Sequence, residues 1–240
     1  MAPTTNFDLS NANSLLATIQ ADSTIDTINL FVTSLAEAVN SDPTKADAIA
    51  ETLASLFAIP ESQTLDIRGV DPDDAEVTTP LQSTFLIALG EWLNYALHET
   101  SLVEPKRTIV EPSNTVLTAA VFSAALLKTG VLASPSYVFS FTRQGLQLPN
   151  AVRETERQEI VAIGACLQLL VAGKIMLDRW LEKSDGSDGI VQALKALSDG
   201  KVILSENGRV LLQKTIDLAE QGFGTGTTAR NAWSVVFPEK

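Results

Sequence analysis

Cysteine and histidine are almost absent from this sequence of 240 residues, which holds one of each, Cys166 and His98. A single cysteine excludes an internal disulfide framework and is typical of a protein in a reducing compartment. One thiol and one imidazole also fall short of the ligand set of a zinc or iron–sulfur site. We therefore expect no metal and no cofactor, and no motif in the chain predicts an enzyme.

These two side chains have ordinary structural interpretations. His98 lies at the end of a predicted helix, where an imidazole interacts favourably with the helix dipole. Cys166 lies among apolar neighbours in another predicted helix, where a thiol behaves as a small hydrophobic group with a raised pKa. A catalytic role for either would need partner side chains that one sequence does not place.

Charge is also scarce, because only 19% of the residues are charged while 45% are hydrophobic. A compact monomer usually carries more surface charge, so this balance suggests that part of the surface is buried by other chains. Residues 1–10 are polar and lack the features of a secretory signal. The apolar segments 115–133 and 160–177 approach membrane-spanning length, but lysines interrupt both, and we interpret them as core helices. The expected location is the cytoplasm.

The charge that is present is unevenly distributed. Residues 1–80 hold thirteen acidic residues against two basic ones, whereas the remaining 160 residues hold sixteen acidic and fifteen basic ones. Residues 112–152 contain no acidic residue, and their only charges are Lys128 and Arg143. A chain polarised in this way can present unlike faces to other copies of itself or to partners.

Apolar residues recur at steps of three and four along most of the chain, which predicts an all-α fold. We expect one domain over residues 1–240, a bundle of about seven helices. The predicted helices cover residues 12–19, 24–40, 42–57, 81–98, 115–129, 150–183, 190–197 and 206–222. Residues 201–214 also fit a hairpin around Asn207-Gly208, although the helical pattern is favoured.

Four segments are predicted to be non-helical. They are an N-terminal arm at 1–10, an acidic loop at 58–80, a short strand or extended arm around 136–143, and a C-terminal arm at 222–240. The acidic loop holds Asp71, Asp73, Asp74 and Glu76 without the ligand order of a calcium loop, so solvated carboxylates are expected. The C-terminal arm joins a glycine-rich spacer, expected to be flexible, to an apolar cluster.

These features favour a non-enzymatic, self-assembling or scaffold-type protein that acts through protein–protein contacts. Its partner would be itself, as a homo-oligomer or filament, or a protein scaffold. In a head-to-tail contact, the acidic region 1–80 of one copy would face the acid-poor region 112–152 of the next. The C-terminal arm would add an exchanged contact through its apolar cluster, which consists of Trp233, Val235, Val236 and Phe237.

Two alternatives stay open. The first is an RNA-coating protein, because aromatic residues and arginines interleaved in this way suit stacking and phosphate contact; the residues concerned are Tyr137, Phe139, Phe141, Arg143, Arg153 and Arg157. The net charge of −12 opposes nucleic-acid binding outside a locally positive groove. The second is a bundle that binds an apolar ligand or a membrane through the helices at 115–129 and 160–177.

Overall fold

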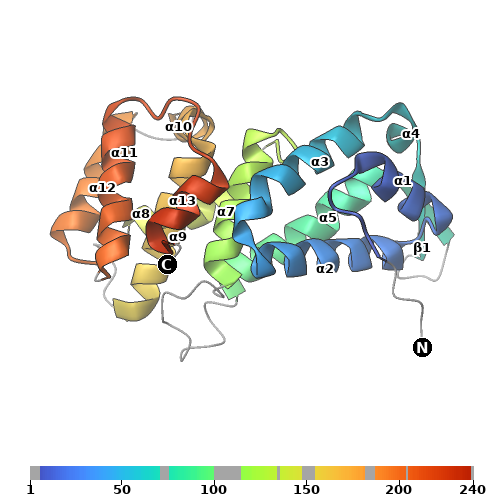
Figure 1. The fold of residues 1–240 in the computed structure, drawn as a ribbon, viewed down its shortest axis with the longest axis horizontal. Helices are drawn as coiled ribbons and strands as arrows, with labels where there is room; N and C mark the ends of the chain where they lie inside the picture. Colours follow the sequence, from blue (N-terminus) through green and yellow to red (C-terminus); the bar gives the residue numbers. More distant parts are fainter. Residues whose placement is uncertain are drawn as a thin grey trace.

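The computed structural model describes residues 6–70, 76–99, 115–133, 136–147, 155–181, 187–203 and 205–238. Helices dominate this part of the chain, and it forms two lobes along the long axis of the molecule (Figure 1). The elements of the N-terminal lobe are α1 (Ala12–Ala21), α2 (Ile25–Ser41), η1 (Pro43–Lys45), α3 (Ala46–Ala58), α4 (Pro60–Gln63), β1 (Asp66–Val70), β2 (Glu76–Pro80), α5 (Leu81–Asn94) and η2 (Tyr95–Glu99). Those of the C-terminal lobe are α7 (Thr115–Lys128), α8 (Ser136–Gln147), α9 (Thr155–Ala172), α10 (Lys174–Leu181), α11 (Ser187–Asp199), α12 (Glu206–Glu220) and α13 (Ala229–Val236).

The all-α prediction is confirmed, and several helices begin at a side chain that caps them. The side chain of Asn11 accepts hydrogen bonds from the backbone N–H groups of Asn13 and Ser14 at the start of α1. Thr24 caps α2 in the same way, and Asp42 caps η1. Short polar side chains at these positions satisfy N–H groups that have no partner inside the helix.

The N-terminal lobe is built on the apolar face of α2, which buries residues at the predicted three- and four-residue steps. Phe31 of α2 lies between Phe7 and Phe85, with ring centroids 5.1 and 5.4 Å apart. Phe7 is buried in this cluster, so the described residues of the predicted N-terminal arm, 6–10, pack against the body. The aromatic cluster explains why: an exposed Phe7 would leave a large apolar side chain in water.

Helices α7 and α9 form the centre of the molecule, and α7 also packs against α2 and α3 of the N-terminal lobe (Figure 1). Every residue of α7 from Val116 to Leu127 is buried, and so is α9 from Glu159 to Ala172. One polar group is satisfied inside this core: the Gln168 side chain accepts a hydrogen bond from the Thr142 hydroxyl and donates one to Ser123. The two apolar segments of membrane length are therefore core helices, as predicted.

The predicted strand at 136–143 is wrong, because these residues belong to helix α8. Its buried residues follow the helical period and face α9; they are Val138, Phe141, Thr142, Gly145 and Leu146. Close packing requires Gly145, since a Cβ there would lie 2.7 Å from the Val161 carbonyl oxygen. The β-structure lies instead within the predicted loop 58–80, where β1 and β2 form an antiparallel pair. Asp66 lies opposite Pro80 at one end of this pair, and Val70 lies opposite Glu76 at the other.

Two further predicted helices can be compared with the structure. The long helix predicted over 150–183 is interrupted at Gly173, which has a φ of +58° and separates α9 from α10. The helix predicted from Glu206 is confirmed over the hairpin alternative. It ends at Gly222, where the N–H of Gly222 donates to the Ala219 carbonyl and the N–H of Phe223 donates to the Leu218 carbonyl. This is the Schellman pattern that a left-handed glycine allows.

Candidate functional site

The structure describes the side chains of four residues of the predicted nucleic-acid site. Tyr137, Phe139, Phe141 and Arg143 all lie on α8, but Phe141 is fully buried, with its ring 5.9 Å from that of His98. Burial also raises the pKa of Tyr137 to about 12. Arg143 is exposed, and Phe139 is half-buried.

The other two members of that set are Arg153 and Arg157. Arg153 lies outside the described residues, as does the side chain of Arg157. Of the acidic loop, Asp71, Asp73 and Asp74 also lie outside the described residues, and Glu76 begins β2. Over the described ranges, no three His, Cys, Asp or Glu residues gather where they could hold a metal ion.

The glycine-rich spacer before α13 is fixed to the body. The N–H of Thr227 donates to the Leu170 carbonyl oxygen at 2.7 Å, and the N–H of Lys174 donates to the Gly224 carbonyl oxygen at 3.0 Å. The spacer therefore supplies partners at the break between α9 and α10, where helix-end groups have none within their own helices. Gly226 lies so close to this break that a Cβ would be 2.3 Å from the Val171 carbonyl oxygen. The spacer is a structural part of the C-terminal lobe.

Helix α13 is held at both ends by other elements. The Asp47 carboxylate of α3 accepts a hydrogen bond from the Ala229 N–H at 2.5 Å, at the positive end of the α13 dipole. Lys128 of α7 donates to the Thr227 carbonyl at 3.1 Å, and Asn207 of α12 donates to the Val236 carbonyl at 2.9 Å. These bonds link α13 to both lobes, so the predicted extended C-terminal arm is instead a helix that joins them.

The predicted assembly residues lie on this helix or just after it. Trp233 is 5% exposed and Val236 is 3% exposed, and both pack against the same chain. Val235 and Phe237 are half-buried. The apolar cluster that follows the spacer therefore buries its largest side chain on its own body.

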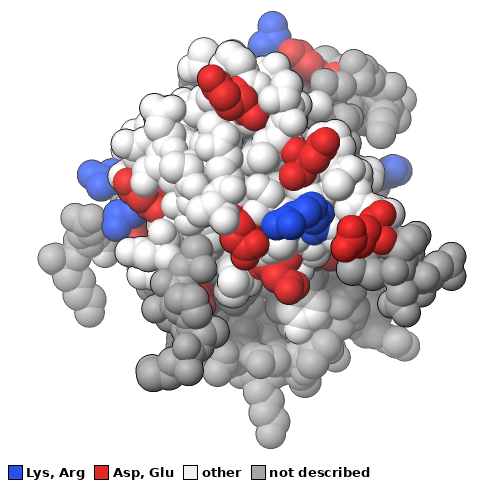
Figure 2. Space-filling view, turned by 90° about the vertical axis from the view of Figure 1, so that its right-hand side faces the viewer, with Lys and Arg blue, Asp and Glu red and all other residues white. Residues whose placement is uncertain are grey.

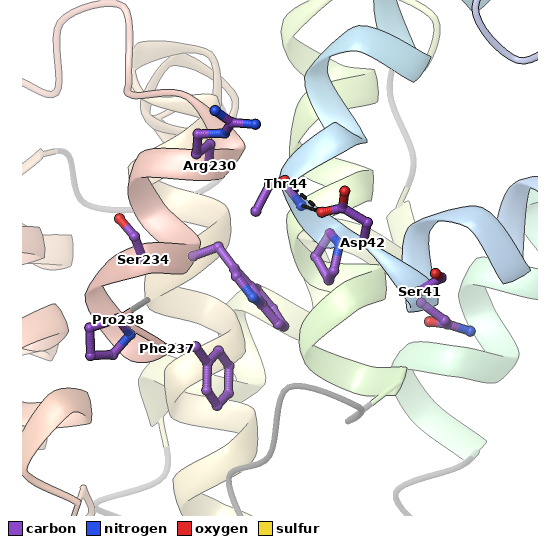
Figure 3. Close-up of a pocket in the computed structure, with 10 residues that line it drawn as sticks. Ser41, Asp42, Thr44, Arg230, Ser234, Phe237 and Pro238 are labelled. Carbon is purple, nitrogen blue, oxygen red and sulfur yellow. Dashed lines mark hydrogen bonds between the residues drawn. The ribbon is translucent and has the colours of Figure 1, made fainter. Parts of the chain in front are cut away.

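A pocket of about 480 Å³ opens beside α13, between this helix and the corner where α2 meets η1 (Figure 3). One wall comes from α13 and the residues after it: Arg230, Trp233, Ser234, Phe237 and Pro238. The opposite wall comes from the N-terminal lobe: Asn40, Ser41, Asp42, Pro43 and Thr44. We call this cavity the junction pocket, and it is our candidate functional site.

Two side-chain acceptors of the junction pocket, those of Asp42 and Asn40, already have partners. One carboxylate oxygen of Asp42 accepts hydrogen bonds from the Thr44 hydroxyl at 2.5 Å and the Thr44 N–H at 3.2 Å. The other forms an ion pair with Lys45 at 3.3 Å. The Thr44 hydroxyl is the main cause of the lowered pKa of Asp42, which therefore stays ionised at neutral pH. The Asn40 side-chain oxygen accepts a hydrogen bond from Thr118.

The main charged donor of the pocket is Arg230. Arg230 is exposed in the first turn of α13, and it forms no ion pair in the part of the chain that the structure describes. The aromatic wall is continuous, with the rings of Trp233 and Phe237 centred 4.7 Å apart. The pocket can therefore accommodate a molecule that carries a flat apolar group beside a negative charge.

Sequence reasoning found the aromatic half of this pocket and missed the rest. Trp233 and Phe237 were identified from their apolar character, but nothing local connects them to residues 40–44. The only available signal was the cap pattern Asp42-Pro43-Thr44, which marks a helix start without indicating what packs on it.

Among the described residues, no helix is both long and apolar enough to cross a membrane. Comparisons of this chain with protein-family models, with curated proteins and with solved structures find no match.

Proposed function

We propose that this chain is a non-enzymatic protein that acts by protein–protein contact, associating with copies of itself through oppositely charged lobes. The observation that supports this is the unequal charge of the two lobes, which lie along the long axis of the molecule (Figure 1). The described residues of the N-terminal lobe, between 6 and 99, include twelve acidic residues against Lys45 and Arg68. Those of the C-terminal lobe, between 115 and 238, include eight acidic and ten basic residues.

Most of the acidic charge on the N-terminal lobe is uncompensated. Within the described part of this lobe, Asp42 is the acidic residue that forms an ion pair, and its partner is Lys45. Figure 2 faces the end of this lobe and shows acidic side chains that outnumber basic ones across the described surface. Uncompensated surface charge of one sign attracts a partner of the opposite sign and speeds their encounter.

The proposed partner face uses only part of the acid-poor region 112–152. Helix α7 lies in this region, and its burial leaves it little surface for contact. Helix α8 lies there too and exposes Arg143, so we expect the opposing charge to come from α8 and from exposed basic residues elsewhere on the C-terminal lobe. Such residues occur on α8, α10 and α12 and before α12; they are Arg143, Lys174, Lys201 and Lys214. A contact between unlike lobes is head-to-tail, and repetition of it yields a ring or a filament.

The experiment is light scattering coupled to size-exclusion chromatography at low and high salt. Exposed ion pairs contribute about 0.2–1 kcal/mol each and are screened by salt, so we expect association at 50 mM NaCl that is lost at 500 mM. A matched pair of charge reversals tests which lobe is responsible. Glu37→Lys changes an exposed acidic residue on α2, and Asp199→Lys changes one at the end of α11 on the other lobe.

Reversal of one exposed charge replaces attraction by repulsion, so Glu37→Lys should weaken association by about 2- to 30-fold, since 1.4 kcal/mol corresponds to tenfold. Asp199→Lys should leave association unchanged or strengthen it. A monomer at every salt concentration, or equal weakening by both variants, would contradict the proposal.

A further inference from the structure

We propose that the junction pocket binds a small aromatic carboxylate, a role separate from the assembly proposed above. Its volume of about 480 Å³ lies in the usual range for small-molecule sites, roughly 300–1,000 Å³. The pocket is also enclosed by segments far apart in the chain, residues 40–44 and 230–238. Figure 3 shows Arg230 and Phe237 on the α13 side of the cleft, opposite Asp42 and Thr44.

The apolar wall selects for an aromatic ring. The rings of Trp233 and Phe237 are neighbours inclined at 41°, and because Trp233 is 5% exposed, the half-buried Phe237 offers most of the accessible ring surface. Pro238 extends this wall. A flat ring of the ligand can lie against these side chains in an offset or tilted arrangement, which aromatic pairs prefer. The wall therefore favours an aromatic ligand over an aliphatic one of similar size.

The polar groups select for a negative charge. Both oxygens of Asp42 are engaged by Thr44 and Lys45, so this carboxylate offers little to a ligand. The guanidinium of Arg230 forms no ion pair with another described residue, and it donates hydrogen bonds and accepts none. A donor of this kind matches a ligand with an anionic acceptor, and a carboxylate fits the fork of an arginine.

The position of Arg230 on its helix supports the same choice. Arg230 lies in the first turn of α13, at the positive end of the helix dipole, where the Asp47 carboxylate already supplies one negative charge. Arg230 precedes Trp233 by three residues, which is about 4.5 Å along the helix axis. This spacing suits a ligand whose carboxylate is attached directly to its ring.

The test is a calorimetric titration of the full chain with benzoate. Its neutral amide, benzamide, is the control for charge, and cyclohexanecarboxylate, which has a ring of the same size, is the control for the aromatic ring. We expect saturable binding of the aryl carboxylate, at least tenfold tighter than binding of either control. Equal affinity for the acid and its amide, or no saturable binding of the acid, would overturn the proposal.

Three variants assign the binding to the pocket. Arg230→Gln should abolish the preference for the acid over the amide, and Phe237→Leu should reduce the preference for the aromatic acid over cyclohexanecarboxylate. Lys214→Gln removes an exposed positive charge from α12, outside the pocket, and should change neither preference. Circular dichroism confirms that each variant is folded. If Lys214→Gln weakens binding as much as Arg230→Gln, the effect is one of net charge and the pocket is not the site.

The two proposals fail independently. Arg230 and Phe237 lie at the junction of the lobes, whereas the assembly proposal depends on exposed acidic residues such as Glu37. Loss of ligand binding without loss of salt-dependent association would remove only the inference about the pocket.

Discussion

Replacement of Gly226 by alanine tests whether the glycine-rich spacer is a fixed part of the fold. Gly226 has a φ of +73°, a conformation that costs an L-residue about 1–2 kcal/mol. An alanine Cβ would also lie 2.3 Å from the Val171 carbonyl oxygen, so the backbone must move. That movement would break the bond from the Thr227 N–H to the Leu170 carbonyl, which contributes about 1 kcal/mol. The expected loss in the free energy of unfolding is about 3 kcal/mol.

Gly222 provides the matched control. Its φ is +79°, but an added Cβ would meet nothing within 4 Å. Gly222→Ala should therefore show the conformational cost alone, about 1–2 kcal/mol. The difference between the two variants measures the close approach of the spacer to α9.

Urea unfolding, followed by tryptophan fluorescence and by far-ultraviolet circular dichroism, gives both free energies. A flexible spacer predicts almost no change in stability, because alanine would restrict the folded and the unfolded chain alike. A Gly226→Ala protein as stable as the parent, or more stable, would refute the reasoning. So would equal losses for Gly226→Ala and Gly222→Ala.

Two other consequences of the structure can be measured in the same way. Asp47→Asn removes the negative charge that α3 places at the N-terminus of α13, and it should lower the free energy of unfolding by about 0.5–1 kcal/mol. Glu51→Gln, on the exposed face of α3, should have no effect. Burial raises the pKa of Cys166 from 9.0 to about 12, so the native protein should not react with a thiol reagent at pH 8, whereas the protein unfolded in urea should react fully. The pKa of Cys166 is higher in the folded protein than in the unfolded chain. The contribution of this buried thiol to the free energy of unfolding is therefore complete below pH 9 and is lost as the pH rises from 9 to about 12. A urea midpoint that stays constant over that interval, or rapid modification of the native thiol, would contradict the burial of Cys166.

Local signals were sufficient for most helix ends. Asn11 and Thr24 start α1 and α2 because their side chains satisfy the first N–H groups within a few residues of themselves. Gly130 and Gly222 follow the ends of α7 and α12 because each has a φ of +79°. Caps and left-handed glycines act over fewer than six residues, so a single sequence contains all the information they need.

The α8 segment shows where local reasoning failed. Tyr137, Phe139 and Phe141 alternate with smaller residues, which is the pattern of a strand. The same residues also place Val138, Phe141 and Thr142 at helical spacing, and the packing of α8 on α9 selects that alternative. Two periodicities coexist in this short segment, and only the neighbouring helix distinguishes them.

The C-terminal segment shows most clearly which features the sequence determines and which features depend on the tertiary structure. Its composition alone showed that the apolar cluster with Trp233 and Phe237 must be buried somewhere, because water excludes large apolar side chains wherever they occur in a chain. Where it is buried depends on residues 40–47, on Leu170 and on Lys128, which are distant in sequence and approach α13 only in the folded molecule. Helix periods and caps are short-range properties, and the sequence expresses them directly. The junction pocket, the fixed spacer and the alignment of charge with the long axis arise from packing between distant segments, so only the tertiary structure decides them.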